Sequence, residues 1–500
     1  MICIPIVAST AEEALRDLER AEQTADMTEL RLDLLPRDVW ATLLQKKKKP
    51  CIMTLRPERE GGHFRHDEST RIALFESLLE YNPDFIDLEW DTPPHPMESL
   101  LKRKSERTGL IVSYHNMIET PQDLEDVLKR VISRGGDVVK IVTQANDLGD
   151  NVRILNLFRK QPGRMIAFCM GPFGTPSRIL TLRSGGFLTF GTLTPGKTSA
   201  AGQLTAGDLR HVYRAHQIGE RTRVFGLIGD PVGHSLSPII HNAAFQALDL
   251  DAVYVPLRVR DVDRLLWILE EIGVEGVSVT IPHKQRIVPL LNDTDEEARR
   301  LDAVNTVYRQ DGQWLGTNTD ADGAWKALGL QGIDHLQHKR WTILGAGGVA
   351  RAVAYSAGVH GSPMSLTVVG RNQERVMGLL DHVRAIFSFP VSGVIYPGGD
   401  VNDLVHATDI LVNATPVGMA PAVDETPIPP HLIEPHHVVF DTVYHPMQTR
   451  LLREARDRGA KTCSGFWMFL YQGAAQFERW TGQKAPFGLM EQRARERLAS

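Results

Sequence analysis

The chain has 500 residues, of which 42% are hydrophobic and 23% charged, and its formal net charge is −5. At about 150 residues per domain, this length predicts about three domains with sizeable cores. The slightly acidic balance argues against a nucleic-acid binder with a broad basic surface. The chain contains no apolar run of about 18 residues, which argues against a membrane span.

Four cysteines are widely spaced and include no CxxC pair: Cys3, Cys51, Cys169 and Cys463. This usage argues against a disulfide framework and against a zinc site, so we expect no metal. The first ten residues, MICIPIVAST, are typical of a strand rather than of a targeting segment. We therefore expect a cytoplasmic protein.

In the first 193 residues, short β-rich apolar runs alternate with amphipathic helical stretches. The runs cover residues 3–8, 28–35, 51–57, 85–90, 109–115, 138–143, 164–171 and 187–193. Eight strands alternating with helices favour a parallel (β/α)8 barrel. An open doubly wound sheet is the alternative.

Ionisable residues lie inside or at the ends of five of these expected strands. They are Glu29 and Arg31, Arg56, Glu89, His115 and Lys140. Because a buried parallel strand is normally almost entirely apolar, these residues predict a shared polar site. We expect it at the carboxyl ends of the barrel strands. Exposed or separately paired charges are the other interpretation.

The residue types in this first half suit imine chemistry. Burial favours the neutral, nucleophilic form of Lys140, and His115 can move protons near neutral pH. Glu89 could orient or balance the charge of that histidine. Arg56 and Arg178 are suited to a substrate carboxylate, because a guanidinium donates two parallel hydrogen bonds. The pattern predicts a Schiff base to a ketone followed by proton abstraction, although a structural role for Lys140 remains open.

These segments resemble type I 3-dehydroquinate dehydratase along nearly all of residues 1–215. The matching pieces are ELRLD (29–33), MTLRPEREGG (53–62), IDLEW (86–90), SYHN (113–116), VVKIV (138–142), GPFGTPSR (171–178) and SAAGQ (199–203). The resemblance implies that Lys140 forms the Schiff base, that His115 is the general acid and base, and that Glu89 is its partner. It also implies that the substrate is held by Glu29, Arg31, Arg56, Arg178, Ser199 and Gln203.

The second half, from about residue 222, contains a dinucleotide-binding pattern. In TILGAGGVARAV, Gly345, Gly347 and Ala350 fit G-x-G-x-x-A between an expected strand and an expected helix. The next strand ends at Arg371, where an enzyme that uses NAD tends to have Asp or Glu. A guanidinium there suits a 2′-phosphate, so we expect NADP. The expected cofactor-binding residues are Gly345, Ala346, Gly347, Gly348, Val349, Ala350, Arg371, Asn372, Arg375 and Gly465.

Lys284 and Asp320 precede this nucleotide-binding stretch and are candidates for a proton-donating pair. Reduction of a ketone forms an alkoxide that must be protonated, and a lysine beside a carboxylate can supply the proton. Ser235 and Ser237, in GHSLSP, could hydrogen-bond a carboxylate. Each of these is also a common loop residue, so a structural role is the other interpretation.

From about residue 222 to its end, the chain resembles shikimate dehydrogenase. The matching pieces are GDPVGHSLSPIIHNAAF (229–245), GVSVTIPHK (276–284), AVNTV (303–307), GTNTDADG (316–323), GAGGVARA (345–352), NATPVGM (413–419), DTVYHPMQTRLL (441–452) and GFWMFLYQGAAQFERWTG (465–482). The resemblance implies that Lys284 and Asp320 are the catalytic pair. It also implies that the substrate contacts Ser235, Ser237, Thr280, Asn305, Tyr444 and Gln472.

Together the two resemblances imply a bifunctional enzyme of the shikimate pathway. We expect a dehydratase-like barrel over 1–218, a shikimate-binding α/β domain over 222–335 plus 465–500, and a Rossmann NADP-binding domain over 336–464. The first activity would dehydrate 3-dehydroquinate to 3-dehydroshikimate, and the second would reduce that product to shikimate. We expect small-molecule substrates and no nucleic-acid or membrane partner. The sequence predicts no particular oligomeric state.

Two other functions are consistent with parts of the sequence. The second half could oxidise quinate or shikimate with NAD. The whole chain could also be a non-catalytic sensor of quinate-type acids, but such a sensor is expected to lose its catalytic side chains. Lys140, His115, Lys284 and Asp320 are all present.

Overall fold

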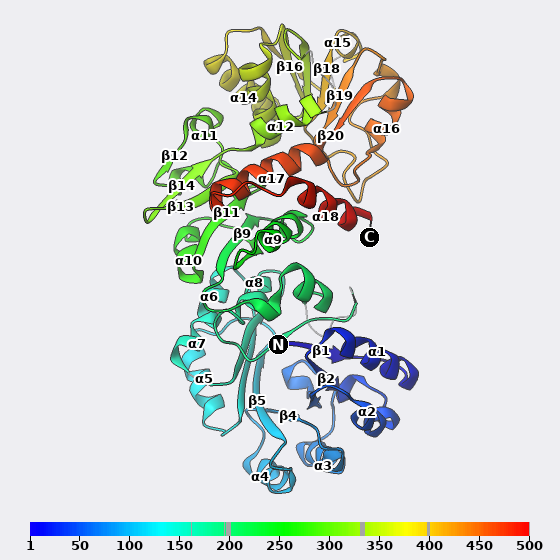
Figure 1. The fold of residues 1–500 in the computed structure, drawn as a ribbon, viewed down its shortest axis with the longest axis vertical. Helices are drawn as coiled ribbons and strands as arrows, with labels where there is room; N and C mark the ends of the chain where they lie inside the picture. Colours follow the sequence, from blue (N-terminus) through cyan, green and yellow to red (C-terminus); the bar gives the residue numbers. More distant parts are fainter. Residues whose placement is uncertain (162, 195, 197–201, 331–335, 398–400, 500) are drawn as a thin grey trace. The chain divides into compact units, whose positions relative to one another are not determined.

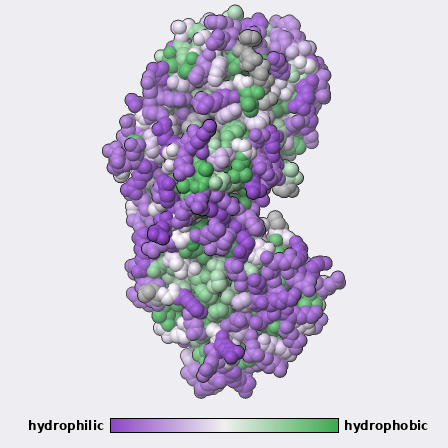
Figure 2. Space-filling view, viewed as in Figure 1, coloured by the Kyte–Doolittle hydropathy of each residue, from purple (hydrophilic) through white to green (hydrophobic). Residues whose placement is uncertain are grey.

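The computed structural model describes residues 1–161, 163–194, 196, 202–330, 336–397 and 401–499. The chain forms two compact units, Met1–Pro238 with Asp249–Glu275, and Ile239–Leu248 with Gly276–Ser500. The finer division into a barrel, a shikimate-binding domain and a Rossmann domain stays a prediction. On the face drawn in Figure 2, hydrophilic residues surround smaller hydrophobic patches. None of the described helices is long and apolar enough to cross a membrane.

The first unit contains the predicted barrel, and the open-sheet alternative is wrong for this half. Eight parallel strands follow the order β7-β6-β5-β4-β3-β2-β1-β8 (Figure 1). The barrel closes where Phe187 N, just before β8, donates a 2.8 Å hydrogen bond to Met165 O of β7. The strands are β1 (Ile2–Ile6), β2 (Met27–Arg31), β3 (Cys51–Thr54), β4 (Phe85–Glu89), β5 (Gly109–Asn116), β6 (Val138–Gln144), β7 (Met165–Met170) and β8 (Thr189–Phe190).

Helices alternate with these strands, as the amphipathic stretches predict. In the first of them, the side chain of Thr10 accepts a hydrogen bond from Glu13 N and caps the helix. Ala14, Leu18 and Ala21 then bury one face at helical spacing. The helices are α1 (Ala11–Thr24), α2 (Trp40–Lys46), α3 (Glu68–Leu78), α4 (Pro94–Arg103), α5 (Leu124–Ile132), α6 (Gly149–Leu155), α7 (Leu157–Lys160) and α8 (Thr175–Leu180).

The interior of the barrel has an apolar layer next to a polar layer. The apolar cluster includes Met27, Ile52, Ile111 and Val138. Because side chains alternate along a strand, the residue two positions further on points to the same side. Those residues are polar and buried: Glu29, Thr54, Ser113 and Lys140. The strand period therefore brings polar groups from four strands to one level of the barrel.

The first unit ends with elements that follow the barrel in sequence. β9 (Arg223–Gly229) and β10 (Ala252–Arg258) pair in parallel, with Gly229 opposite Arg258. α8 contacts β10, and α6 contacts α10 (Leu265–Ile272).

The second unit contains two sheets. In the first, β11 (Val274–Val279) and β13 (Thr306–Gln310) are antiparallel, β14 (Gln313–Thr317) is antiparallel to β13, and β12 (Asp293–Thr294) is parallel to β14. α12 (Asp320–Leu330) packs closely on α17 (Gly465–Thr481). A Cβ atom on Gly323 would lie 3.1 Å from Met468 O, so this close approach of helices favours glycine.

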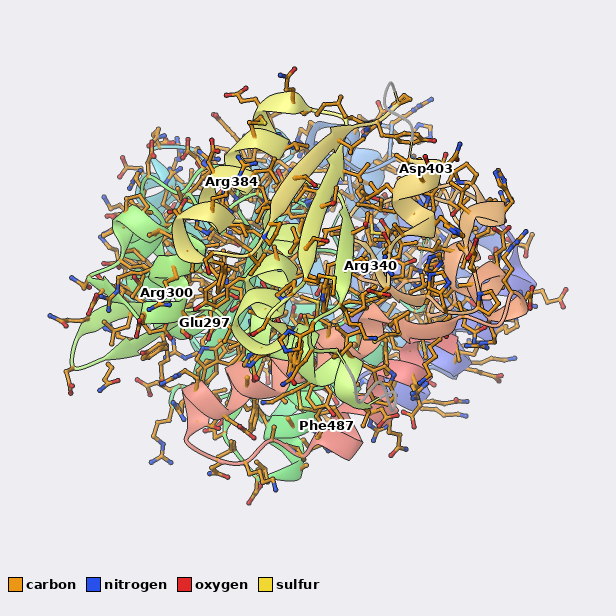
Figure 3. All side chains as sticks on the ribbon, turned by 90° about the horizontal axis from the view of Figure 1, so that it is seen from above. Glu297, Arg300, Arg340, Arg384, Asp403 and Phe487 are labelled. Carbon is orange, nitrogen blue, oxygen red and sulfur yellow. The ribbon has the colours of Figure 1, made fainter. Side chains whose placement is uncertain are left out.

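The other sheet is doubly wound, as the Rossmann pattern predicts. Its six parallel strands follow the order β17-β16-β15-β18-β19-β20, which places the first strand, β15, at the topological switch point. Arg340, labelled in Figure 3, begins β15 and pairs with Asp409. The strands are β15 (Arg340–Leu344), β16 (Ser365–Gly370), β17 (Val391–Ile395), β18 (Ile410–Asn413), β19 (Val438–Asp441) and β20 (Lys461–Ser464).

The remaining helices either cover this sheet or lie at the edges of the two units. They are α9 (Ser237–Ala247), α11 (Glu296–Leu301), α13 (Gly348–Ser356), α14 (Gln373–Ile386), α15 (Asn402–His406), α16 (Arg450–Asp457) and α18 (Phe487–Ala499).

Candidate active sites

Lys140 lies on β6 with its ammonium group in the polar layer of the barrel, and it is only 4% exposed. Its Nζ atom is 2.8 Å from Oδ2 of Asp87 and 3.5 Å from Oε1 of Glu29. It also lies 4.8 Å from the centroid of the Phe190 ring. Two carboxylates and an aromatic face can therefore stabilise a positive charge at this nitrogen.

Arg56 gathers the carboxylates of β4 beside this lysine. Its guanidinium donates to Glu89 Oε1 at 2.6 Å, to Ser113 Oγ at 2.7 Å and to Asp87 Oδ2 at 2.7 Å. Burial alone would raise the pKa of Asp87, but the charges of Arg56 and Lys140 hold that pKa well below its usual range. The guanidinium expected to bind substrate is thus engaged by protein groups.

His115 corrects one pairing expected from the sequence. Its Nδ1 atom lies 2.9 Å from Oε2 of Glu60, not beside Glu89. Glu89 is held between Arg56 and Arg71, at 2.6 and 2.5 Å. The expected Glu89–His115 pair is therefore wrong, because β4 directs the Glu89 carboxylate toward two arginines.

Glu60 is the functional candidate that the sequence analysis missed. It lies in a short helical turn (Glu58–Glu60) after β3, and it is 6% exposed. Burial raises the pKa of Glu60 to about 9, against the lowering effect of Arg56. Burial and the charges of Arg56 and Lys140 hold the pKa of His115 well below its usual value. The pair therefore holds a proton on the carboxyl while the imidazole is neutral, as a proton relay requires.

The other residues expected to hold the first substrate have different surroundings. Glu29 accepts a 2.9 Å hydrogen bond from Thr54, while Arg31 makes two hydrogen bonds to Asp33, at 3.0 and 2.8 Å. The Arg178 guanidinium lies 4.7 Å from the Phe168 ring centroid, and burial lowers its pKa to about 10. Gln203 is partly buried, and Ser199 lies outside the described residues.

In the second unit, Lys284 and Asp320 form the expected pair. Lys284 Nζ lies 2.6 Å from Asp320 Oδ2, and their side chains are 15% and 7% exposed. Asp320 begins α12, and its backbone N donates to Asn318 Oδ1 at 2.9 Å. Backbone bonding also holds Lys284, whose carbonyl accepts a 2.8 Å hydrogen bond from Val304 N.

A network of amides and hydroxyls surrounds Asn305. Thr319 N donates to Asn305 Oδ1 at 2.9 Å, and Asn305 Nδ2 lies 3.0 Å from Thr319 Oγ1 and 3.4 Å from Gln472 Oε1. Gln476 Nε2 donates to Asn305 O at 3.0 Å. This brings two expected substrate residues together, Asn305 and Gln472. Thr319 was not among the expected residues, although it lies in the same TNTD stretch as Asp320.

Four further expected substrate residues have hydroxyl-bearing side chains and lie in separate places. Ser235 and Ser237 belong to the first unit, where their Oγ atoms are 3.1 Å apart. In the second unit, Thr280 O accepts a 2.9 Å hydrogen bond from His283 N, after the end of β11. Tyr444 stacks on Phe469 at 4.8 Å, and burial raises the pKa of its phenol.

The glycine-rich turn after β15 forms a cradle for a phosphate group. Gly345 has φ +112°, and a Cβ atom there would lie 2.8 Å from Ala414 O. Gly347 is the N-cap of α13, and a Cβ atom on it would meet open space. A dinucleotide pyrophosphate fits here, because the helix N-terminus supplies N–H donors and no side chain blocks its approach. The turn also includes Ala346, Gly348, Val349 and Ala350.

Arg371 follows β16 at the same edge of the sheet and is exposed. A Cβ atom on the preceding Gly370 would lie 3.9 Å from Ala346 Cβ, so the two turns are adjacent. Asn372 caps α14, where its Oδ1 accepts from Arg375 N at 2.9 Å, and Arg375 is exposed. Arg371 thus lies at the end of β16, beside the glycine-rich turn, as the sequence predicts, and Asn372 stabilises the turn between β16 and α14.

Gly465 and Asp441 fix the backbone at the carboxyl ends of the neighbouring strands of the same sheet. A Cβ atom on Gly465 would lie 2.2 Å from Thr442 O, so only glycine fits there. Asp441 accepts hydrogen bonds from Asn413 at 2.9 Å and from Thr449 at 2.5 Å. Burial raises the pKa of Asp441 to about 6. These contacts fix the turns that follow β18 and β19.

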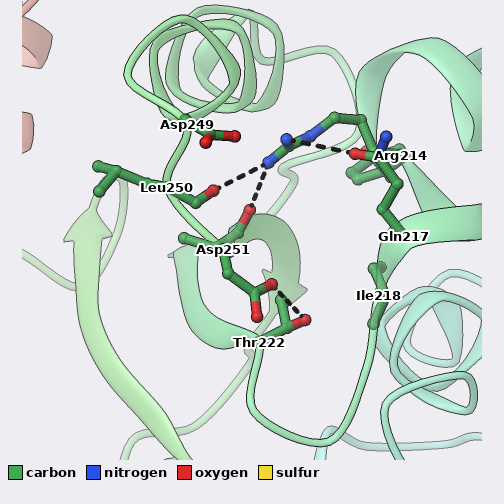
Figure 4. A pocket seen from close by; sticks show the side chains of 9 residues that line it. Arg214, Gln217, Ile218, Thr222, Asp249, Leu250 and Asp251 are labelled. Atoms are coloured by element: carbon green, nitrogen blue, oxygen red, sulfur yellow. Dashed lines mark hydrogen bonds between the residues drawn. The ribbon is translucent and has the colours of Figure 1, made fainter.

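A separate cavity of about 200 Å³ lies between the barrel and β10, apart from all the expected site residues (Figure 4). Arg214 donates across it to Leu250 O and Ala252 O, both at 3.2 Å, and Thr222 donates to Asp251 at 2.7 Å. The arginine of this cavity is thus bonded to backbone carbonyl groups of the protein. The described residues include no cluster of three or more His, Cys, Asp or Glu side chains that could hold a metal, and the four cysteines are free.

Three family models match the chain. They are type I 3-dehydroquinase over residues 2–220, the shikimate dehydrogenase substrate binding domain over 227–307, and the shikimate 5′-dehydrogenase C-terminal domain over 465–495. The chloroplastic bifunctional 3-dehydroquinate dehydratase/shikimate dehydrogenase of Arabidopsis thaliana is 37% identical over 509 residues, which cover 97% of this chain and 83% of that protein. A shikimate dehydrogenase (NADP(+)) of Desulforamulus reducens is 40% identical and covers 55% of this chain and 95% of its own.

Solved structures resemble the second half. A shikimate dehydrogenase in complex with NADP+ has a TM-score of 0.51 and 35% identity, covering 56% of this chain and 97% of its own. A quinate dehydrogenase from Corynebacterium glutamicum in complex with NAD has a TM-score of 0.52 and 32% identity, covering 55% of this chain and 99% of its own.

Proposed function

The chain belongs to the family of bifunctional 3-dehydroquinate dehydratase/shikimate dehydrogenases, and we propose that it catalyses both reactions in sequence. The barrel dehydrates 3-dehydroquinate to 3-dehydroshikimate. The second half reduces that product to shikimate with NADPH. The observation that carries the proposal is that one chain holds two separate lysine–carboxylate centres, Lys140 with Asp87 and Lys284 with Asp320.

In the first reaction, the neutral amine of Lys140 attacks the ketone carbon of the substrate. The amine becomes neutral by giving its third proton to His115, and after the attack the nitrogen passes a second proton to the former carbonyl oxygen. That oxygen takes the proton held by His115 and leaves as water, so a protonated imine with a positively charged nitrogen forms. Asp87 and Glu29 flank this nitrogen and stabilise its charge. The imine makes the neighbouring C–H acidic, because the electron pair that remains is delocalised onto the positive nitrogen.

His115 is the group placed to remove that proton. It then returns a proton to the β-hydroxyl, which leaves as water, and hydrolysis of the imine releases the enone and regenerates Lys140. Glu60 holds Nδ1 of His115 at 2.9 Å, so it orients the ring and shares its proton. Arg56 keeps the Asp87 carboxylate ionised beside the imine.

In the second reaction, Lys284 supplies the proton to the oxygen of the reduced ketone. Asp320 holds the lysine ammonium at 2.6 Å and so fixes its position. Asn305 and Gln472 orient the ring hydroxyls of the substrate, because their amides are already held in place. Thr319 bonds to the Asn305 amide, and Asn305 Nδ2 and Phe469 O bond to the Gln472 amide. Ser235 and Ser237 bind the substrate carboxylate.

NADP is the cofactor that the second half fits. NADPH bound there supplies the hydride. The turn from Gly345 to Gly347 would hold the pyrophosphate, and Arg371 would hold the 2′-phosphate through charge-assisted hydrogen bonds. Relatives of the second half are named as NADP(+) enzymes.

Oxidation of quinate or shikimate with NAD is the second candidate, because a quinate dehydrogenase with bound NAD has a similar fold. Arg371 favours NADP, since an NAD enzyme tends to place an acidic residue there. The sensor alternative is disfavoured because Lys140, His115, Lys284 and Asp320 are all retained.

We also infer that the protein works in the cytoplasm on small-molecule substrates. The four free, buried cysteines support a reducing compartment. The plant relative is named as chloroplastic, so localisation of a tagged full-length protein would decide between the two.

The test of the proposed function is a coupled assay with the purified chain as the only enzyme. On addition of 3-dehydroquinate and NADPH, we expect nicotinamide absorbance to fall and shikimate to accumulate. A parallel reaction with 3-dehydroshikimate isolates the second step. Turnover of 3-dehydroshikimate without turnover of 3-dehydroquinate would refute the dehydratase activity. If neither substrate is converted, the whole proposal is refuted.

A further inference from the structure

Phe173 connects the barrel to the strands that follow it within the first unit. It lies in the turn between β7 and α8 and is 4% exposed. The Arg258 guanidinium lies 4.9 Å from its ring centroid, and that of Arg260 lies 4.6 Å from it. Both arginines belong to the β10 segment, which follows the barrel in the chain. A barrel turn is therefore held by two cations of the dehydrogenase half.

The backbone of Phe173 transmits this contact to a residue of the dehydratase site. Asn151 Nδ2 donates to Phe173 O at 2.8 Å, and Asn151 Oδ1 accepts from Ser177 N at 3.2 Å. Asn151 itself is fully buried. Ser177 immediately precedes Arg178, which the resemblance to type I 3-dehydroquinate dehydratase assigns to substrate binding. The position of the Phe173 turn therefore sets the position of Arg178.

Arg258 has a second contact on its other side. Its Nε atom lies 2.6 Å from Asp230 Oδ1, and both side chains are about one quarter exposed. Asp230 follows β9 and begins the turn that carries Ser235 and Ser237. One guanidinium thus contacts the turn before Arg178 and the turn before the two serines.

Other contacts hold these segments together without Arg258 or Phe173. Arg183 donates to Thr222 O at 2.9 Å and to Ile272 O at 3.1 Å. Arg214 bonds to Leu250 O, as Figure 4 shows from close by, and it also bonds to Ala252 O. Variants at Arg258 or Phe173 should therefore leave the first unit folded.

We propose that Arg258 and Phe173 are positioning residues that couple the substrate-binding turns of the two active sites. The inference rests on the proposed function. Arg258 acts on the dehydratase through Phe173, Asn151 and Arg178, and on the dehydrogenase through Asp230 and the turn with Ser235 and Ser237. A substitution in one half of the chain then changes substrate binding in the other half.

The experiment measures both activities separately in Arg258→Gln and Phe173→Leu, with saturating NADPH for the second. We expect Arg258→Gln to raise the dehydratase KM for 3-dehydroquinate about fivefold, with kcat changed by less than about twofold. We expect Phe173→Leu to raise the dehydrogenase KM for 3-dehydroshikimate by a smaller factor. The double variant should be non-additive, because both changes remove the contact between Arg258 and Phe173, although Phe173→Leu also removes the contact with Arg260.

Two further variants separate coupling from general damage. Arg264→Gln removes a similar cation–π contact, with Trp267 at 4.6 Å, that touches neither turn, so both KM values should stay unchanged. Arg258→Lys keeps a charge for Asp230 but loses the planar face over Phe173, so it should restore the dehydrogenase KM more than the dehydratase KM.

Each outcome decides the inference. If Arg258→Gln changes only the dehydrogenase KM, Arg258 serves the Asp230 turn alone and the coupling is refuted. Equal effects of Arg258→Gln and Arg264→Gln would also refute it. If the wild-type chain lacks either activity, the proposed function is refuted, and this inference is refuted with it.

Discussion

His115 Nδ1 lies 2.9 Å from Oε2 of Glu60, in a barrel where Glu89 was the expected partner. Glu60 is 55 residues earlier in the chain and is carried by a turn rather than by a strand. A buried carboxyl with a pKa of about 9, beside an imidazole whose pKa is lowered, forms a pair that exchanges one proton.

Glu60→Gln should lower the dehydratase kcat about 100-fold while leaving borohydride trapping of the Lys140 imine intact. The amide can still orient His115, but it cannot take up or release a proton. Single-turnover kinetics and trapping with 3-dehydroquinate measure the two steps separately. Glu89→Gln should disturb Arg56 and Arg71 and lower stability instead. The assignment of Glu60 as the partner of His115 would be wrong if Glu89→Gln stopped proton transfer and Glu60→Gln did not.

Lys140→Met should abolish dehydration and imine trapping but retain reduction of 3-dehydroshikimate. Lys284→Met should do the reverse and lower reduction about 1000-fold. The reason is that each lysine serves a separate centre, with Asp87 or Asp320. The retained activity in each variant shows that the chain has folded. If Lys140→Met still dehydrates its substrate, the Schiff-base assignment fails.

Arg371→Ala should raise the KM for NADPH about tenfold or more and leave the KM for NADH nearly unchanged, because only NADPH has a 2′-phosphate for the guanidinium. Steady-state kinetics with both cofactors give the ratio. Arg384→Ala is the matched control, since Arg384 is an exposed arginine of α14 that pairs with Asp381 (Figure 3). An equal rise in the KM for NADH would show that Arg371 does not bind the 2′-phosphate.

Glu297→Gln should stabilise the protein at pH 8 but not near pH 4.5. Burial and the charges of Asp295, Asp322 and Asp320 raise the pKa of Glu297 to about 7. The folded state therefore holds this proton more tightly than the unfolded state, so wild-type stability declines as pH rises from about 4.5 to about 7. Glutamine cannot ionise, so it removes the cost of ionising the half-buried Glu297 carboxyl. We expect this to raise the free energy of unfolding at pH 8 by about 1 kcal/mol after solvent screening.

Chemical denaturation of wild type and Glu297→Gln at several pH values tests this prediction. Glu297 and Arg300 both lie on α11 and are labelled in Figure 3. Arg300→Gln is a control on the same helix, where its partner Glu296 is exposed, and its effect should not grow with pH in this range. A difference between wild type and Glu297→Gln that is independent of pH would exclude ionisation as its cause.

Much of the barrel site could be predicted from local sequence. Lys140 and Glu29 are polar residues in apolar strands, and the two-residue period places them at one level of the barrel interior. The pairing of His115 could not be predicted in the same way, because EREGG offers two acids and IDLEW two more. Which carboxylate reaches the imidazole depends on how a turn after β3 folds over β5.

Local sequence determined the fold class of each half, the glycine-rich turn and the identity of the reactive side chains, because strand and helix periods act over a few residues. Only the tertiary structure decided the partners of those side chains. It placed Glu60 on His115, used Arg56 to hold Asp87 and Glu89, and placed Phe173 beside Arg258. A hydrogen bond or cation–π contact needs two groups within a few ångströms, and for groups far apart in the chain that distance is set by strand register and packing.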